Sequence, residues 1–200
     1  MTGAFRTLVG LGCVATSLAL VPAAGAQARR PVSVGLAVGS TVPLSDYAND
    51  TKIGVHGAGF LQYEPDKGIW GVRGEVAYHR SDFTDEALGD VGAQPGDNVR
   101  SAITHVGATA LLIGNKRDRS VTPYLLGGLG LYRVTVSASS GTLSLSSSEN
   151  GFGFNGGAGL RVGRNTGFFV EARFHQFSIT PDGGTKSTYQ MIPVTVGVRF

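Results

Sequence analysis

Apolar and polar residues alternate along several stretches of the chain, which is the pattern of a β-strand with two different faces. The alternation is clearest in residues 191–200, where every second residue is apolar. Residues 69–80, 152–162 and 168–176 repeat the pattern, with ionisable side chains on the second face. Four further strands, less regular in their alternation, are predicted at residues 32–39, 53–64, 101–113 and 122–135. The sequence thus predicts eight strands.

The connections between these strands alternate in length. Short turns join the second strand to the third, the fourth to the fifth and the sixth to the seventh, at residues 65–68, 115–120 and 164–167. The other connections are about 10 to 20 residues long and polar. Short turns at one end and long loops at the other are typical of membrane barrels. We therefore predict an all-β fold, an eight-stranded antiparallel up-and-down transmembrane β-barrel.

A soluble barrel is the structural alternative. Lipocalins and streptavidin have strands of the same period, but their apolar faces line a ligand cavity and their polar faces meet water. Here the polar faces carry few large polar residues between Gly and Ala, which suits a crowded interior better than a hydrated surface. Inversion of the faces, with the apolar side turned to lipid, is therefore the favoured interpretation.

Aromatic residues near the strand ends support the membrane interpretation, because amphipathic rings gather at the two interfaces of a bilayer. The first expected girdle, beside the short turns, consists of Tyr63, Trp70, Tyr124, Phe168 and Phe200. The second, beside the long loops, consists of Tyr78, Tyr132, Phe152 and Tyr189. In a soluble barrel the same rings would be core residues.

Ionisable residues on the second faces are placed to meet inside the barrel. Arg73 and Glu75 lie on the third predicted strand, and Glu171 and Arg173 lie on the seventh. These strands lie on opposite sides of an eight-stranded barrel, so their long side chains are expected to meet across the lumen. Arg161 is expected to pair with Glu171 across the adjoining hairpin. Side chains fill a barrel of this size, so we predict a structural plug of salt bridges, with a narrow gated ion path as the alternative.

The first 26 residues have the pattern of a secretory signal. Arg6 provides the positive end, residues 8–21 form an uncharged apolar stretch, and small residues precede a cleavage site after Ala26. The apolar stretch is shorter than the roughly 20 residues that span a bilayer as a helix. We predict a cleaved signal peptide at residues 1–26 and a barrel domain at residues 27–200.

The one cysteine of the chain, Cys13, lies inside this predicted signal. Cleavage after Ala26 would leave no cysteine, and therefore no disulfide or thiolate chemistry. The alternative is that Cys13 follows a weak lipoprotein box and becomes a lipidated first residue. That processing would leave an apolar segment at the mature terminus.

Composition agrees with short strands and tight turns. Of 200 residues, 31 are Gly and 42% are hydrophobic, which argues against a disordered chain. The formal net charge of +3 comes from charges scattered along the chain, so there is no basic block for nucleic acid. The glycine-rich runs at residues 127–130 and 156–159 are expected to make room for bulky neighbours, because no helix follows them to bind a phosphate.

Two segments carry a resemblance to a known family. The final residues 194–200, VTVGVRF, resemble the signal that outer-membrane barrels present to the barrel-assembly machinery, and residues 123–132, PYLLGGLGLY, look like the fifth strand of small barrels of the OmpA, OmpX and OmpW superfamily. The resemblance implies the outer membrane as location, and outer-membrane lipid, lipopolysaccharide and the assembly machinery as partners. The assembly signal it implies consists of Val194, Val196, Val198 and Phe200.

The favoured function is non-enzymatic: a structural barrel, or one that binds a surface ligand or lipopolysaccharide through its long loops, of which the second, residues 81–100, holds five acidic residues. A narrow channel for ions or small apolar solutes, as in OmpW, is the alternative. A lipid A hydrolase is disfavoured, because its His and Ser are two residues apart, whereas His175 and Ser178 are three apart and point oppositely in a strand. No cofactor is predicted, and no His and carboxylate cluster has metal-site spacing.

Overall fold

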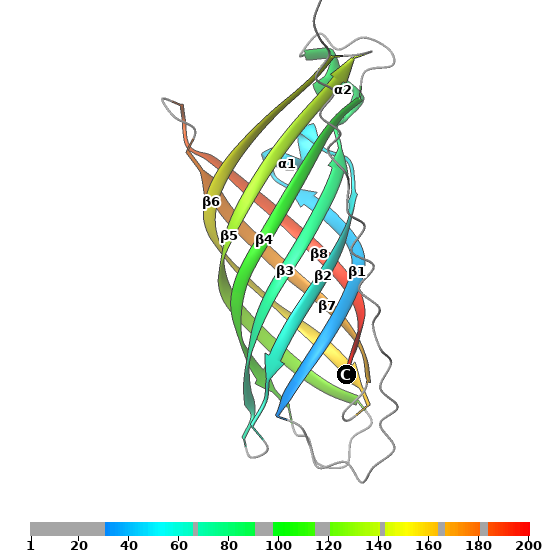
Figure 1. The fold of residues 1–200 in the computed structure, drawn as a ribbon, viewed down its shortest axis with the longest axis vertical. Helices are drawn as coiled ribbons and strands as arrows, with labels where there is room; N and C mark the ends of the chain where they lie inside the picture. Colours follow the sequence, from blue (N-terminus) through cyan, green and yellow to red (C-terminus); the bar gives the residue numbers. More distant parts are fainter. Residues whose placement is uncertain are drawn as a thin grey trace, which may run out of the picture.

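The structure, a computed structural model, describes residues 31–65, 68–90, 98–114, 121–140, 143–163, 167–180 and 184–200. Within these ranges eight strands close into one antiparallel barrel (Figure 1). The strands are β1 (Val32–Leu44), β2 (Gly54–Tyr63), β3 (Trp70–Asp82), β4 (Asn98–Ile113), β5 (Val121–Ser140), β6 (Leu143–Val162), β7 (Gly167–Ile179) and β8 (Ser187–Arg199). The predicted fold class is confirmed, and the predicted signal lies outside the described residues.

Two short helices, α1 (Asp46–Asp50) and α2 (Asp85–Asp90), lie in the long connections after β1 and β3. In the described part of the chain no helix is long and apolar enough to cross a membrane. Both helices lie at the end of the barrel that carries the long connections, which we call the long-connection end (Figure 1).

The strands are strongly tilted because their pairing is staggered. Each strand pairs with its neighbour in sequence, and β1 pairs with β8. Following paired residues once around the barrel from Val34 leads back to Leu44, ten residues further along β1. Such a stagger tilts the strands by about 35–45°. A row of paired residues therefore climbs toward the long-connection end by slightly more than one residue per strand.

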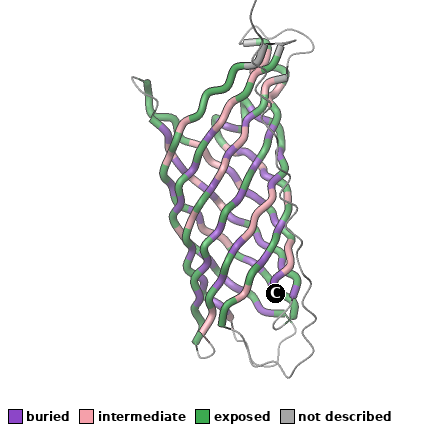
Figure 2. Tube along the Cα trace, viewed as in Figure 1, coloured by how far each residue is buried: buried purple, intermediate pink, exposed green. Residues whose placement is uncertain are grey.

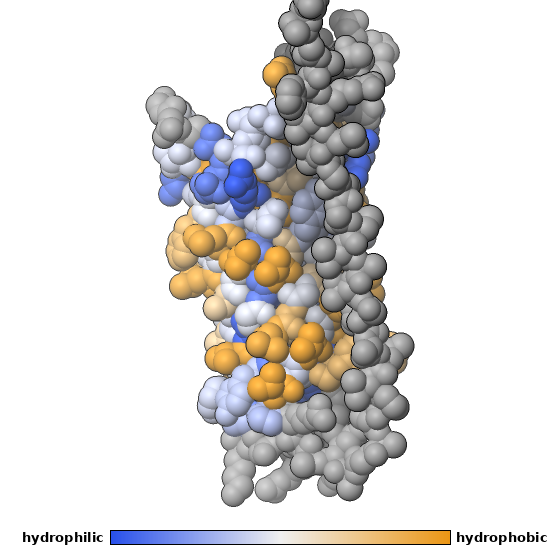
Figure 3. Space-filling model, viewed as in Figure 1, coloured by the Kyte–Doolittle hydropathy of each residue, from blue (hydrophilic) through white to orange (hydrophobic). Residues whose placement is uncertain are grey.

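The apolar faces of the strands point outward. Burial alternates along the strands within the barrel wall (Figure 2). Large apolar side chains such as Val34, Leu131 and Phe168 are exposed, whereas Arg73 and Glu171 are almost fully buried. Hydrophobic side chains cover much of the barrel wall, with hydrophilic ones beyond them toward the long-connection end (Figure 3). The soluble alternative, which needs the opposite orientation, is thereby contradicted.

The predicted aromatic girdles are confirmed only in part. Six of the predicted rings lie on the outer surface: Tyr63, Trp70, Tyr78, Phe152, Phe168 and Phe200. Tyr124 and Tyr132 are instead buried in the lumen, and Tyr189 packs against the buried cluster there. The placement of Tyr124 was wrong because residues 124–126 are apolar on both faces, so sequence alternation does not fix which side faces lipid.

In the region predicted as the third long loop, residues 137–150, the described residues 137–140 and 143–150 form regular β-structure. Strand β5 runs to Ser140 and pairs with β6 from Leu143 onward, so the two strands project past the rest of the barrel (Figure 1). The loop prediction was wrong because an apolar face marks a strand only where that face meets lipid or a core. Most side chains described in this projection are exposed, and the sequence keeps no such face there.

Candidate functional site in the barrel interior

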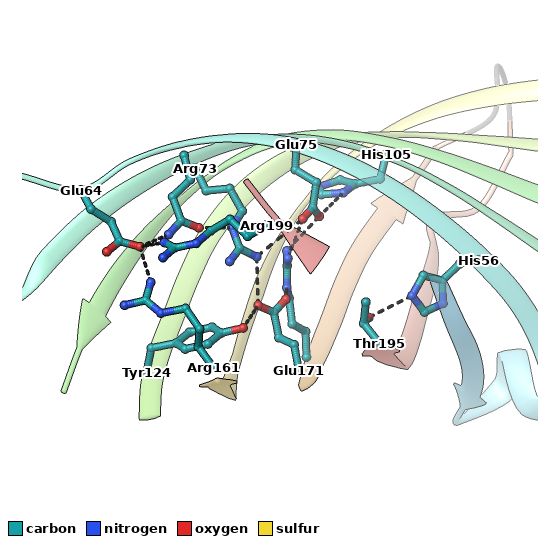
Figure 4. A network of polar contacts seen from close by, with 12 residues as sticks. His56, Glu64, Arg73, Glu75, His105, Tyr124, Arg161, Glu171, Thr195 and Arg199 are labelled. Atoms are coloured by element: carbon teal, nitrogen blue, oxygen red, sulfur yellow. Dashed lines mark hydrogen bonds and ion pairs between the residues drawn. The ribbon is translucent and has the colours of Figure 1, made fainter. Parts of the chain in front are cut away.

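Four charged residues meet at the middle of the lumen, and we call them the charge layer: Arg73 and Glu75 of β3, and Glu171 and Arg173 of β7. Arg73 Nη1 lies 2.9 Å from Glu171 Oε2. Arg173 donates two hydrogen bonds to the Glu75 carboxylate, at 2.9 and 2.6 Å, and its Nε donates to Glu171. The predicted contact between β3 and β7 across the lumen is present (Figure 4).

The order of the charges along the two strands explains this pairing. Strands β3 and β7 run in the same direction, because every second strand of an up-and-down barrel is parallel. Along β3 the arginine precedes the glutamate by two residues, whereas along β7 the glutamate precedes the arginine. Opposite charges therefore face each other at both levels. All four side chains are less than 10% exposed, so the pairs are desolvated and every charge needs its partner.

Neighbouring side chains complete the charge layer. Tyr124 donates a hydrogen bond of 2.8 Å to Glu171 Oε2, and Arg73 Nε donates one of 2.8 Å to Gln62 Oε1. The Arg73 guanidinium also lies 4.2 Å from the centre of the Phe60 ring, a cation–π contact. Sequence reasoning did not find these three partners, although the position of Gln62 opposite the apolar face of its strand was a usable signal.

A second ionic group lies nearer the short turns, around Glu64. Arg161 Nη1 lies 2.6 Å from Glu64 Oε1, and Arg199 pairs with the same oxygen. The expected pair between Arg161 and Glu171 is therefore wrong. Glu171 already accepts bonds from two arginines and Tyr124, and Arg161 lies closer to the short-turn end, where Glu64 is its neighbour (Figure 4).

On the other side of the charge layer lie all four histidines of the chain, which we call the histidine layer: His56, His79, His105 and His175. Each comes from a different strand, and all are less than 10% exposed. Neighbouring ring centres are 5.0 Å apart for His56 and His79, and 5.3 Å apart for His105 and His175. Sequence alternation places these side chains inward, but it does not show that they converge at one level.

Hydroxyl groups hold three of these rings. Thr41 Oγ1 lies 2.8 Å from His79 Nδ1 and 3.1 Å from His56 Nδ1, and the Tyr132 hydroxyl lies 2.9 Å from His175 Nδ1. Neither ring nitrogen of His105 has a hydrogen-bond partner among the described residues, and its Nδ1 lies 3.8 Å from Glu75 Oε1 (Figure 4). His105 instead stacks on Tyr132, with ring centres 4.6 Å apart.

Glycines make room for the rings of the interior. A Cβ atom on Gly130 would lie 2.3 Å from His105 Nε2, and one on Gly159 would lie 2.3 Å from the Tyr124 ring. Both distances are far inside van der Waals contact, so these rings lie where only glycine fits. The expectation that residues 127–130 and 156–159 accommodate bulky neighbours is confirmed at these two positions.

The long-connection end of the lumen is closed by stacked aromatic rings. Tyr132, Phe177 and Tyr189 stack with centres 4.2 and 5.1 Å apart, and Tyr47 of α1 packs edge-on against Tyr189. Between the charge and histidine layers lies a cavity of about 20 Å³, lined by residues of both layers. This is room for about one water molecule. The described interior is therefore filled by side chains.

The described residues offer no catalytic arrangement of the hydrolase type. His175 is buried in the lumen, whereas Ser178, three residues later, lies on the other face and is hydrogen-bonded to Thr188 at 3.2 Å. Within the same ranges no group of three or more His, Cys, Asp or Glu side chains is arranged to hold a metal ion.

A match to a family model identifies the family of this barrel, whose lumen is filled and whose apolar side chains point outward. The model described as outer membrane protein beta-barrel domain matches residues 11–200. The chain belongs to this family. Its location is accordingly the outer membrane of Gram-negative bacteria. No curated protein matches the chain.

Solved structures of small outer-membrane barrels share the fold. Neisserial surface protein A is 18% identical, with a TM-score of 0.56, and the match covers 86% of this chain and 98% of that one. Ail of Yersinia pestis, in complex with the heparin analogue sucrose octasulfate, is 19% identical with a TM-score of 0.52, covering 84% and 97%. A major outer membrane protein of Thermus thermophilus is 12% identical with a TM-score of 0.51, covering 86% and 100%.

The residues of the predicted assembly signal lie on the outer face of β8. Val194, Val196 and Phe200 are each about half exposed, and Val198 is half-buried. The Phe200 backbone exchanges two hydrogen bonds with Val34 of β1, at the seam where the first and last strands of this family member meet. Recognition of these side chains by the assembly machinery stays a prediction.

Proposed function

We propose that the protein is a non-enzymatic outer-membrane barrel that binds an extended polypeptide outside the cell through an open edge of β6. One observation carries the proposal. Residues 143–150 of β6 pair with β5 on one side. On the other side, pairing with β7 begins only at Gly151. Among the described residues, eight positions of β6 therefore have a strand on one side alone.

An open strand edge presents backbone N–H and C=O groups in a regular row, which is a template for a further strand. Extended peptides bind to such edges by main-chain hydrogen bonds, while side-chain contacts supply specificity. Natural proteins usually block an edge with lysine, proline or a short strand. The segment 143–150 is long, has no lysine or proline, and exposes Leu145. Because the long-connection end of such barrels lies outside the cell, a partner would meet this edge there.

The filled lumen supports a non-conducting role for the rest of the barrel. The charge layer, the histidine layer and the aromatic stack follow one another along the axis, and the cavity between the first two holds about one water molecule. Planar bilayer recordings of the purified protein are expected to show no discrete current steps. Steps of constant size would favour the channel alternative instead.

The proposal is tested with the barrel in lipid nanodiscs and a phage-displayed library of random peptides as the probe. Peptides selected on the wild type are expected to bind the L145K/S147K variant at least about tenfold more weakly, because lysines along an edge block strand addition. The matched control is Ser137→Lys, since Ser137 lies beside Ser146 but on β5, which is paired on both sides.

Selected peptides that bind all three proteins equally would contradict the proposal, as would a library that yields no binder. Hydrogen exchange gives a second readout. Amides of residues 143–150 are expected to become protected when a selected peptide is added, while those of residues 84–90 do not change. Protection confined to residues 84–90 would place the interaction in the connection after β3 and overturn the assignment to β6.

A further inference from the structure

Two arginines point outward from the barrel wall just past its apolar surface. Arg80 of β3 and Arg133 of β5 are both exposed. On each strand the residue two positions nearer the short turns is an exposed apolar or aromatic side chain, Tyr78 on β3 and Leu131 on β5. The two arginines therefore stand where the lipid-facing surface ends and the interface begins.

The register brings these arginines to the same height, on either side of one threonine. Arg80 pairs with Ala102 of β4, and Arg133 pairs with Thr104. Tyr78 also pairs with Thr104, so Tyr78, Thr104 and Arg133 form one row of paired residues across β3, β4 and β5. Because such a row climbs by about two and a half residues over two strands, Arg133 lies higher than Tyr78 by about the same amount as Arg80, which is two residues above Tyr78. Two strand spacings and a two-residue offset separate the Cα atoms by roughly 12 Å.

Neither guanidinium has an acidic partner in the described part of the chain. Other basic residues of this end do: Arg100 lies 3.8 Å from Asp82, and Lys52 lies 2.9 Å from Asp85. Between Arg80 and Arg133 the outward side chains of β4 are small, those of Ala102 and Thr104. Two unpaired arginines thus flank a shallow space that carries a hydroxyl group.

We propose that Arg80 and Arg133, with Thr104 between them, bind a phosphate group of the glycolipid of the outer leaflet. Arginine forms bidentate, charge-assisted hydrogen bonds with phosphate, and a span of roughly 12 Å lets both side chains reach one anion. The occupant is a lipid phosphate because the apolar wall directly below the arginines is covered by acyl chains, which hold the headgroups at this height. The proposal rests on the outer-membrane location and is independent of peptide binding at β6.

Native mass spectrometry of the purified barrel with diphosphoryl lipid A as the probe tests the site. The R80Q/R133Q variant is expected to bind the lipid about tenfold more weakly than the wild type. The K52Q/R100Q variant loses the same charge from the same end at arginine and lysine positions that have acidic partners, and it is expected to stay within about twofold. Lipid A without its phosphates is expected to bind all three proteins equally weakly.

An equal loss in both double variants would show a diffuse charge effect and overturn the site, and so would wild-type affinity in R80Q/R133Q. Displacement of the lipid by equimolar inorganic phosphate would show a free-anion site instead. Folding of each variant is checked on a gel, because a folded barrel changes its migration when the sample is heated. If the double variant fails this check, the single R80Q and R133Q variants replace it, and each is expected to bind the lipid about threefold more weakly than the wild type. Peptide binding at β6 is expected to be unchanged in all of them, which separates the two proposals.

Discussion

The charge layer and the histidine layer occupy neighbouring levels of one lumen but are held in different ways. In the charge layer each carboxylate accepts hydrogen bonds from at least one arginine. In the histidine layer the rings pack against one another, His105 stacks on Tyr132, and three rings are hydrogen-bonded to hydroxyl groups, while several ring nitrogens have no partner among the described residues. Ionic pairing therefore fixes the first level, and ring packing with hydroxyl hydrogen bonds fixes the second.

The largest effect is expected from removing one charge of the first level. Glu171→Gln leaves two buried arginines with a weakened partner, which should lower the free energy of unfolding by about 3–5 kcal/mol. Urea unfolding in lipid vesicles, followed by the fluorescence of the single tryptophan, Trp70, measures it. As a control, Asp85→Asn breaks an exposed pair with Lys52 and should leave the midpoint unchanged. Equal midpoints for both variants would contradict an ionic first level.

Packing of rings against glycine is tested next. Gly159→Ala places a Cβ atom 2.3 Å from the Tyr124 ring, and the required shift should cost about 1–3 kcal/mol. Gly156→Ala on the same strand is the control, because its Cβ atom would meet nothing nearer than 3.7 Å. The same urea titration compares the two variants. A loss of stability in Gly156→Ala as large as that in Gly159→Ala would argue against ring packing as the cause.

Within the histidine layer, the effect of a substitution should depend on hydrogen bonds. His56 is bonded to Thr41 and Thr195, so His56→Phe should cost about 1–2 kcal/mol. His105 has no such partner, and His105→Phe should change stability by less than about 1.5 kcal/mol. If His105→Phe is the more damaging of the two in urea unfolding, its ring does more than pack.

The smallest effect is expected outside the lumen. Replacing residues 137–146 by an Asn-Gly turn joins Val136 to Ser147, which are paired residues of β5 and β6, and this turn suits a two-residue hairpin. The melting temperature should stay within a few degrees of that of the wild type, because both interior layers remain intact. A collapse of stability would show that the projection supports the barrel. Loss of peptide binding with unchanged stability would separate function from fold.

Much of the fold could be predicted because lipid imposes a simple rule on each strand. One face must be apolar, so alternation gave the eight strands and the inward direction of Arg73, Glu75, Glu171 and Arg173. The rule applies only within the membrane, which is why the prediction of a loop at the projection of β5 and β6 was wrong. The rule also does not show which side faces lipid where both faces of a strand are apolar, as around Tyr124.

The contacts within the lumen depend on the stagger between the strands, which cannot be deduced from the sequence of any single strand. The stagger of ten residues around the barrel determines which inward side chains share a level. It places Arg161 beside Glu64, brings the four histidines together, and sets Glu171 against Arg73. The number of strands alone placed β3 opposite β7, whereas the level at which each inward side chain meets its partner depends on the stagger, which is why the predicted hairpin pair of Arg161 and Glu171 was wrong.

The reversed charge order on β3 and β7 also selects how the barrel closes during assembly. Because side chains alternate between faces, a misregistered closure keeps the apolar side outward only if it slips by two residues. Such a slip changes the stagger around the barrel by two residues, and it changes the relative level of β3 and β7, which lie four strands apart, by about one. A larger stagger would bring Glu75 level with Glu171 and bury like charges together, so the charge order penalises a closure that the apolar pattern alone would permit.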